Sequence, residues 1–264
     1  MPGVNRSVTK ALEILDLLGQ VQGVLRLKEI ALHLGLPEST THRLLASLAE
    51  RGYVQQRTHN GDYALGWQIV TLAQSLSTEL RLVQNVRPCL EKLRSQVRHA
   101  VNLAVLSDSQ VTYLDCLVPN HSPSLFMPPG FRAPAHATAL GKVLLAHLPT
   151  KERDAVLGRL SLRASTTHTV TSLDALRSIL LRIQEDGYAV DRGEFVTEVN
   201  CVAAPIKGPG GETVAAISVT MREQELPERW EEDIVSLVCA TAAEASRRHA
   251  GIVPIAAGRA VTGR

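Results

Sequence analysis

The chain has 264 residues, of which 45% are hydrophobic and 20% charged, so it is long enough for about two domains and too apolar for a disordered chain. No apolar run approaches the ~18 residues of a membrane span, and Glu13 and Asp16 interrupt the first apolar segment, so we expect a cytoplasmic protein without a membrane partner. The net charge of +2 does not by itself indicate nucleic-acid binding.

The first third of the chain predicts three helices. Residues 7–18 have helical apolar spacing, with Ser7 as the expected N-cap. A short helix is expected at residues 27–34, with Gly35 as its C-terminal stop. A third helix opens at Pro37-Glu38 and runs to about residue 50. Two short helices joined by a tight turn have the spacing of a helix-turn-helix.

The third helix divides into two faces at 100° per residue. The inward stripe consists of Thr41, Leu44, Leu45 and Leu48, and the opposite face carries Ser39, His42, Arg43, Ala46 and Glu50. An arginine on the outward face of a helix in the major groove could bind guanine O6 and N7 together. An ordinary amphipathic helix with a solvated face would show the same pattern, so both interpretations stay open here.

A β-hairpin is expected directly after these helices. Residues 53–58 and 63–65 have strand character and flank an Asn-Gly turn, the strongest short hairpin pattern because both central residues need φ > 0. Three helices followed by a hairpin predict a winged helix, whose wing tip would approach phosphates or the minor groove. The candidate DNA contacts are therefore Ser39, Thr40, His42, Arg43, Arg57 and His59.

The remaining two thirds predict a sheet with helices. Helical stretches are expected at residues 67–77 and 80–97, either as a linker and dimerisation seam or as part of the next core. Strands follow at 101–106, 111–116, 188–191, 201–206 and 213–221, and helices at 138–147, 151–159, 171–186 and 227–249. An antiparallel sheet covered by helices gives the fold class α+β.

Three stretches resemble the IclR family of bacterial transcriptional regulators. LKEIALHLGLPESTTHRLLASLAERGYV resembles its DNA-binding domain, and GFRAPAHATALGKVLLAHLP and CVAAPIKGPGGETVAAISVT resemble its ligand-binding domain. The resemblance covers about residues 5–250. It implies a winged helix-turn-helix at 1–66, a linker helix at 67–80, a GAF-like effector-binding and oligomerisation domain at 81–250 and a flexible tail at 251–264.

The same resemblance implies how the protein works. We expect a homodimer or dimer of dimers that binds double-stranded operator DNA, a small organic-acid effector that modulates this binding, and no cofactor. Repression is favoured over activation, but the residues leave both open, because the sign depends on where the operator lies relative to the promoter. The implied effector-contacting positions are Leu125, Ala133, Ala139, Leu140, Asp191, Val199, Cys201, Ser218 and Thr220.

The residue types at these positions suit a carboxylate. Ala139 and Leu140 start a predicted helix, where backbone amides are unpaired, and Ser218 and Thr220 alternate along one strand face. The alternative for the two hydroxyls is a solvent-facing strand side. Ala139 at a position where the family can have glycine, and Phe126 beside Leu125, do not identify the effector. A glyoxylate- or pyruvate-sized acid and an aromatic acid both remain open, with a slight preference for the aromatic acid.

Enzyme motifs fail on inspection. ALGKV at 139–143 resembles a phosphate loop, but His136 stands where the first glycine is needed and Val143 where a magnesium-binding hydroxyl is needed. No histidine pair has metal-ligand spacing, and a structural role for His136 is favoured over metal binding. Two alternatives to a regulator remain: an enzyme with an incidental helix-turn-helix, and an adaptor that binds protein instead of DNA.

Overall fold

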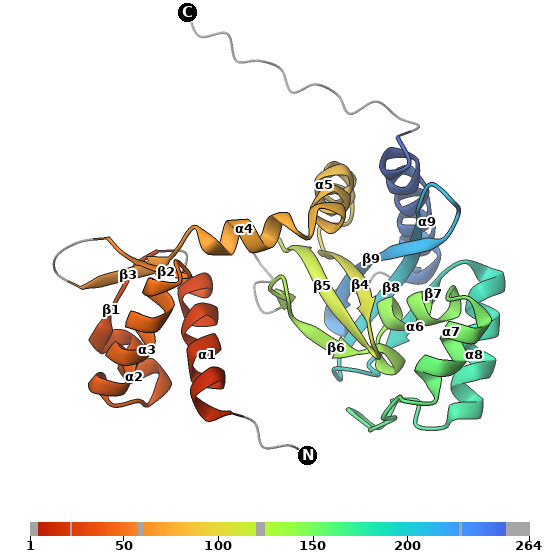
Figure 1. Ribbon diagram of the computed structural model, residues 1–264. Coiled ribbons are helices and arrows are strands. Elements are labelled where there is room, and N and C mark those ends of the chain that lie inside the picture. The colour runs from red at the N-terminus through yellow and green to blue at the C-terminus, as the bar shows by residue number, and fades with distance from the viewer. Residues whose placement is uncertain (1–4, 22, 58–60, 120–124, 227–228, 252–264) are drawn as a thin grey trace, which may run out of the picture. The chain divides into compact units, whose positions relative to one another are not determined.

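The computed structural model describes residues 5–21, 23–57, 61–119, 125–226 and 229–251 (Figure 1). His59 and most of the predicted tail lie outside them. The chain divides into two compact units, residues 1–79 and 80–264. None of the described helices combines the length and apolar character that crossing a membrane requires.

The first unit has the predicted three helices and hairpin. Its helices are α1 (Arg6–Val21), α2 (Leu27–Leu34), α3 (Glu38–Glu50) and α4 (Gln68–Gln74), and its strands are β1 (Leu25–Arg26), β2 (Val54–Gln56) and β3 (Asp62–Leu65). The sheet order is β1-β3-β2, so the hairpin gains a third strand that the sequence analysis missed. A two-residue strand is too short to show alternation.

Local hydrogen bonds explain where these helices begin and end. The predicted N-cap Ser7 is wrong: Asn5 caps α1, because its Oδ1 accepts the Ser7 amide at 3.1 Å. Gly35 ends α2 as predicted, with φ of 60°, a left-handed conformation that glycine adopts without a steric penalty. Ile14, Ile30 and Leu45 are fully buried and bring α1, α2 and α3 around one small core.

The second unit is built on one antiparallel sheet with the order β6-β5-β4-β9-β8-β7. Its strands are β4 (Ala100–Ser107), β5 (Gln110–Leu117), β6 (Arg132–Pro134), β7 (Ala189–Arg192), β8 (Val199–Lys207) and β9 (Thr213–Arg222). Its helices are α5 (Ser77–Val97), which starts within the first unit, α6 (Ala139–Ala146), α7 (Thr150–Leu157), α8 (Leu173–Asp186) and α9 (Trp230–His249). The α+β class is confirmed, and only the short strand β6 among these strands was not predicted.

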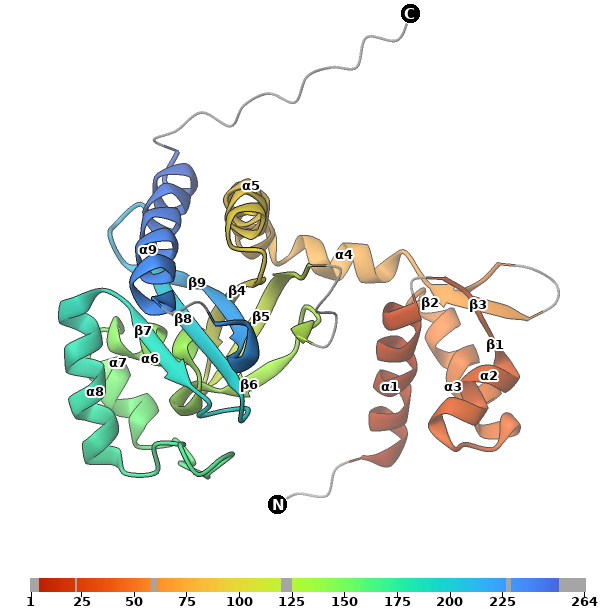
Figure 2. The same ribbon diagram turned by 180° about the vertical axis from the view of Figure 1, so that it is seen from behind.

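The sheet separates two hydrophobic cores. Helices α5 and α9 cover one face, and α6, α7 and α8 lie on the other (Figures 1 and 2). Along β4, Val101 and Leu103 point to α5 and α9, whereas Asn102 and Ala104 point to the opposite side, because strand side chains alternate. The second of these faces carries the polar residues of the unit's cavity.

Candidate functional site

The outward face of α3 carries the candidate DNA contacts. Thr41 and Leu45 are buried, as the predicted inward stripe requires, and Ser39, His42 and Arg43 are exposed. Thr40 is half-buried at the edge of this face. The helix therefore presents hydrogen-bonding side chains near its N-terminus, while its back holds the small core.

The wing contributes one described candidate. Arg57 is exposed just after β2, and its amide donates to the Asp62 carbonyl at 2.9 Å at the loop end of the hairpin. Gly61 has φ of 80°, in agreement with the conformation expected for the Asn-Gly turn. Contact with DNA stays a prediction for all six candidate residues.

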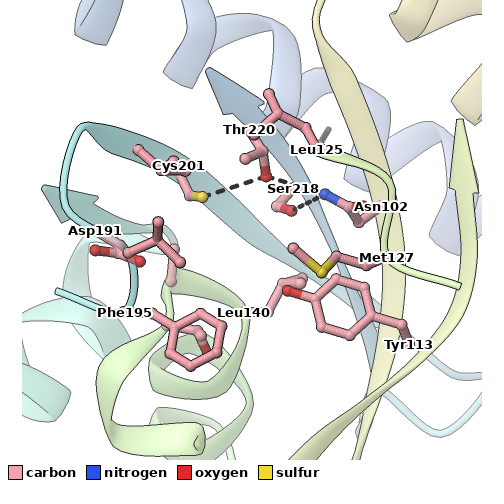
Figure 3. A pocket seen from close by; sticks show the side chains of 14 residues that line it. Asn102, Tyr113, Leu125, Met127, Leu140, Asp191, Phe195, Cys201, Ser218 and Thr220 are labelled. Atoms are coloured by element: carbon pink, nitrogen blue, oxygen red, sulfur yellow. Dashed lines mark hydrogen bonds between the residues drawn. The ribbon is translucent and has the colours of Figure 1, made fainter. Parts of the chain in front are cut away.

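In the second unit a cavity of about 140 Å³ lies between the sheet and α6 (Figure 3). Eight of the nine predicted effector positions line it: Leu125, Ala139, Leu140, Asp191, Val199, Cys201, Ser218 and Thr220. Sequence reasoning missed six further lining residues: Asn102, Tyr113, Met127, Thr138, Phe195 and Val196. The cavity brings together residues separated by more than a hundred positions.

Ala133, the ninth predicted position, does not line the cavity, and its contact with an effector stays a prediction. It lies on β6 opposite Val111, is fully buried, and packs in the hydrophobic core against α6 instead of lining the cavity. Because β6 was not predicted, its pairing with the edge of β5 could not be used to place this residue.

Strand register places the polar floor of the cavity. Thr220, Cys201 and Asp191 are direct neighbours across β9, β8 and β7, and Asn102 is paired with Ser218 one row along. Directly paired residues point to the same side of a sheet. Ser218 is buried, so the alternative of a solvent-facing side is wrong for it.

Asn102 connects the two predicted hydroxyls. Its Nδ2 donates to Ser218 Oγ at 3.2 Å and to Thr220 Oγ1 at 3.0 Å, and Thr220 Oγ1 also lies 3.2 Å from Cys201 Sγ (Figure 3). Burial raises the pKa of the Cys201 thiol, first of all, and the charge of Asp191 adds to this effect. The sequence does contain a feature that could have identified Asn102: it is a polar residue inside the apolar stretch VNLAVL.

A β-bulge brings Tyr113 to the cavity. Leu103 pairs with Asp115, but Ala104 pairs with Tyr113, so Leu114 is the extra residue. This shift puts Tyr113 on the cavity face together with Cys116, although an odd number of positions separates the two. Burial, with the nearby charges, raises the pKa of the Tyr113 phenol and keeps it neutral. Its ring packs edge-on against Phe131, with 5.7 Å between the ring centroids.

The start of α6 supplies backbone donors. Thr138 caps the helix, since its Oγ1 accepts the Gly141 amide at 3.1 Å. The Ala139 and Leu140 amides belong to the first turn, where an amide has no acceptor within the helix. Gly141 lets the segment around Ala135 lie close against the start of α6, because a Cβ at Gly141 would lie 2.2 Å from the Ala135 carbonyl oxygen.

One buried acid lies at the end of the polar row. Burial raises the pKa of Asp191 from 3.8 to about 7, against the lowering effects of the Glu194 amide, which donates to Asp191 Oδ1 at 2.7 Å, and of Lys142. The buried Lys142 ammonium donates to the Val190 carbonyl at 2.9 Å and to the Glu194 carboxylate. The nearest cation is therefore already paired, and the cavity wall offers neutral donors.

Metal chemistry finds no support in the described part of the chain. Within it, no cluster of three or more His, Cys, Asp or Glu side chains could hold a metal ion. His136 is buried, and its Nε2 lies 3.0 Å from the Arg163 carbonyl oxygen, a contact that anchors the segment before α6.

Comparison with known proteins decides the family. Residues 7–58 match the family profile described as the IclR helix-turn-helix domain, and residues 74–247 match the profile described as bacterial transcriptional regulator IclR C-terminal. The chain belongs to the IclR family. The predicted family is thus confirmed, and this is a family of transcriptional regulators, with no enzymatic activity indicated.

Individual relatives agree. The chain is 33% identical to the regulator XynR of Escherichia coli over 215 residues, which are 81% of this chain and 85% of XynR. It is 33% identical to the E. coli transcriptional repressor IclR over 83% of this chain and 80% of the repressor. A solved IclR homologue from Microbacterium hydrocarbonoxydans, in complex with 4-hydroxybenzoate, is 27% identical, with a TM-score of 0.74 over 93% of this chain and 99% of its own.

Proposed function

We propose that this IclR-family regulator binds a specific operator through α3 and the wing, and that a small organic acid in the cavity modulates this binding. The proposed direction of regulation is repression, and the proposed localisation is the cytoplasm. The observation that carries the DNA part is the exposed face of α3, where Ser39, His42 and Arg43 stand above a buried stripe. Such a face suits the major groove.

The size of the cavity supports a ligand with one ring. At about 140 Å³ it is similar to an engineered cavity of roughly 150 Å³ that holds benzene. Its donors are the hydroxyls of Ser218 and Thr220 and the first-turn amides of α6, and these suit a carboxylate. The relative crystallised with 4-hydroxybenzoate supports an aromatic acid.

The proposed assembly is a homodimer that pairs into a dimer of dimers. In α4 and directly beside it, large apolar side chains are exposed, among them Trp67 (77%), Leu72 (49%) and Leu76 (54%). A second copy of the same helix would cover them and hold two winged helices on a two-fold operator. Light scattering of Leu72→Glu against the unmodified protein tests this step.

The effector acts through a difference in affinity. Only an effector that prefers one pose of the protein can shift the operator equilibrium, and a tenfold preference corresponds to about 1.4 kcal/mol. The central experiment is a gel shift with DNA from upstream of the protein's own gene, followed by titration with organic acids. A shift that an acid reverses supports the proposal. Turnover of the acid would favour an enzyme, and no shift with any upstream DNA would favour an adaptor.

A further inference from the structure

No Lys or Arg is among the described residues that line the cavity, which raises the question of how its polar floor would distinguish an acid from a neutral ligand. A hydroxyl can donate or accept, so Ser218 and Thr220 alone do not decide what they bind. Whether each hydroxyl donates to a ligand or accepts from it depends on its hydrogen-bond partners inside the protein. In this chain that partner is Asn102, which is 1% exposed and touches both hydroxyls.

The orientation of the Asn102 amide follows from hydrogen-bond accounting. With Nδ2 toward the hydroxyls, both N–H groups have acceptors, and Oδ1 is left buried without a hydrogen bond among the described residues. The reverse orientation would leave two N–H donors unpaired at the same buried place, which costs more. Asn102 therefore donates to both oxygens.

Thr220 is then restricted further by its neighbour. Its Oγ1 has two lone pairs, one of which accepts from Asn102, while the Cys201 thiol lies 3.2 Å away. The raised pKa of Cys201 keeps the S–H proton in place, so the thiol can donate to the second lone pair. When the thiol donates in this way, both lone pairs of Thr220 Oγ1 are used and its hydroxyl donates into the cavity.

We propose that Asn102 determines effector specificity: by donating to both hydroxyls it occupies a lone pair on each and favours orientations in which their hydrogens point into the cavity, so that the preferred bound group is an acceptor such as a carboxylate oxygen. This inference rests on the proposed function, since it concerns the same cavity and an acidic effector. It assigns to Asn102 a positioning role, because the residue acts through the two hydroxyls.

The test measures preference for an acid over its matched amide. Two probe pairs, benzoate with benzamide and pyruvate with pyruvamide, cover the two ligand sizes, and calorimetry on the full chain gives the ratio of their dissociation constants. The unmodified protein should prefer the acid by about tenfold or more, the usual effect of a hydrogen bond to a charged group. In Asn102→Asp the new carboxylate can only accept from the two hydroxyls, whose lone pairs then face the cavity. The preference for the acid over the amide should therefore reverse.

A neutral variant separates hydrogen-bond polarity from charge repulsion. Asn102→Leu keeps the approximate shape and frees both hydroxyls to turn, so the acid preference should fall by about tenfold without any new charge. In a background that carries Ser218→Ala and Thr220→Val, the same change should have no further effect on the ratio, because Asn102 acts through these hydroxyls. Asn200→Asp is the matched control: Asn200 is a buried asparagine of β8 outside the cavity, and the ratio should stay unchanged.

The outcomes distinguish the two proposals. Suppose that the acids bind but Asn102→Leu keeps the full acid preference, or that Asn102→Leu lowers this preference by the same factor with and without the two hydroxyls. Either result overturns the role of Asn102 and leaves the acid effector standing. If neither acid of the two pairs binds the unmodified protein, the proposed acid effector is overturned, and the inference falls with it.

Discussion

The two candidate sites of this protein are built in opposite ways. The DNA-binding face is exposed and comes from consecutive turns of one helix, with Leu45 buried directly behind Arg43. The effector cavity is buried, and its polar floor comes from β4, β7, β8 and β9, joined by strand register. An exposed site on one helix depends on the local core beneath it, whereas a buried site depends on how distant strands pair.

The largest effect should come from removing the core behind the exposed site. Leu45→Ala deletes a fully buried side chain of a small core and should cost about 2–5 kcal/mol, enough to unfold the first unit near room temperature. Thermal unfolding of the full chain should show the transition of the first unit lowered and effector binding retained. Leu32→Ala is the matched control, because Leu32 is 85% exposed on α2 and its truncation should change stability by less than about 0.5 kcal/mol. An unchanged melting profile for Leu45→Ala would contradict the inward stripe.

The buried site should respond to pH instead. The pKa of Asp191 is raised to about 7 from 3.8, so the folded protein holds a proton that the unfolded chain loses. The stabilising effect of this proton is complete below about pH 4 and is lost as the pH rises toward 7, a change of roughly 4 kcal/mol. Asp191→Asn should therefore flatten the fall in unfolding free energy over this range, measured by urea denaturation.

An exposed carboxylate provides the control for this experiment. Asp174 on α8 is 94% exposed at its side chain, so Asp174→Asn controls for the replacement of a carboxylate by an amide at a solvated position. The groups around Asp191 are Lys142, Glu194 and the neutral Cys201 and Tyr113. If Asp191→Asn has the same slope as the unmodified protein, the carboxyl titrates near its ordinary pKa and is not desolvated.

This contrast also explains what the sequence could predict. The stripe of Thr41 and Leu45, the stop at Gly35 and the positive φ of Gly61 follow from local patterns, and the structure has each of them where expected. The spacing of Ser218 and Thr220 is also a local pattern, and it predicted that the two hydroxyls share one face of a strand.

Long-range pairing was not accessible in this way. Tyr113 reaches the cavity only because a bulge at Leu114 reverses the faces of β5, and no local pattern marks that extra residue. Phe195 lies in the connection between β7 and β8, held by the Thr169 hydroxyl on the Glu194 carbonyl. The place of Ala133 in the core could not be predicted, because its short strand pairs it with Val111, 22 positions earlier.

Removing a hydroxyl from the cavity should give an intermediate effect. Ser218→Ala and Thr220→Val each nearly preserve the shape of the side chain. Each should weaken the binding of an acidic effector by about 1.5–3 kcal/mol, as expected for the loss of a hydrogen bond to a charged group. Calorimetry with the cognate acid measures this. Thr241→Val is the control: Thr241 is also buried, but its hydroxyl donates to the Leu237 carbonyl at 2.8 Å within α9. Equal affinity in the double cavity variant would place the effector elsewhere.

Arg43→Ala should change sequence preference and leave stability intact, because the side chain is exposed and contributes nothing to the core behind it. The loss of a bidentate contact to guanine costs about 1–3 kcal/mol and relaxes selectivity at one base pair. Footprinting and binding to a set of single-base operator variants measure this. Arg51→Ala controls for the lost charge, since Arg51 lies beyond the end of α3. The same protected sequence at similar affinity would mean that α3 does not read the operator.

Arg57→Ala should have the smallest effect and a different character. Arg57 is exposed at the loop end of the wing hairpin, where we expect a contact to phosphate that carries no sequence information. Its removal should weaken all operators about equally and lower the slope of log affinity against log salt by about one. Salt titrations of both variants on the same operators decide between the two roles. If Arg57→Ala changes base preference while Arg43→Ala changes only the salt slope, the assignments of helix and wing are reversed, and the wing is the part of the protein that distinguishes one operator from another.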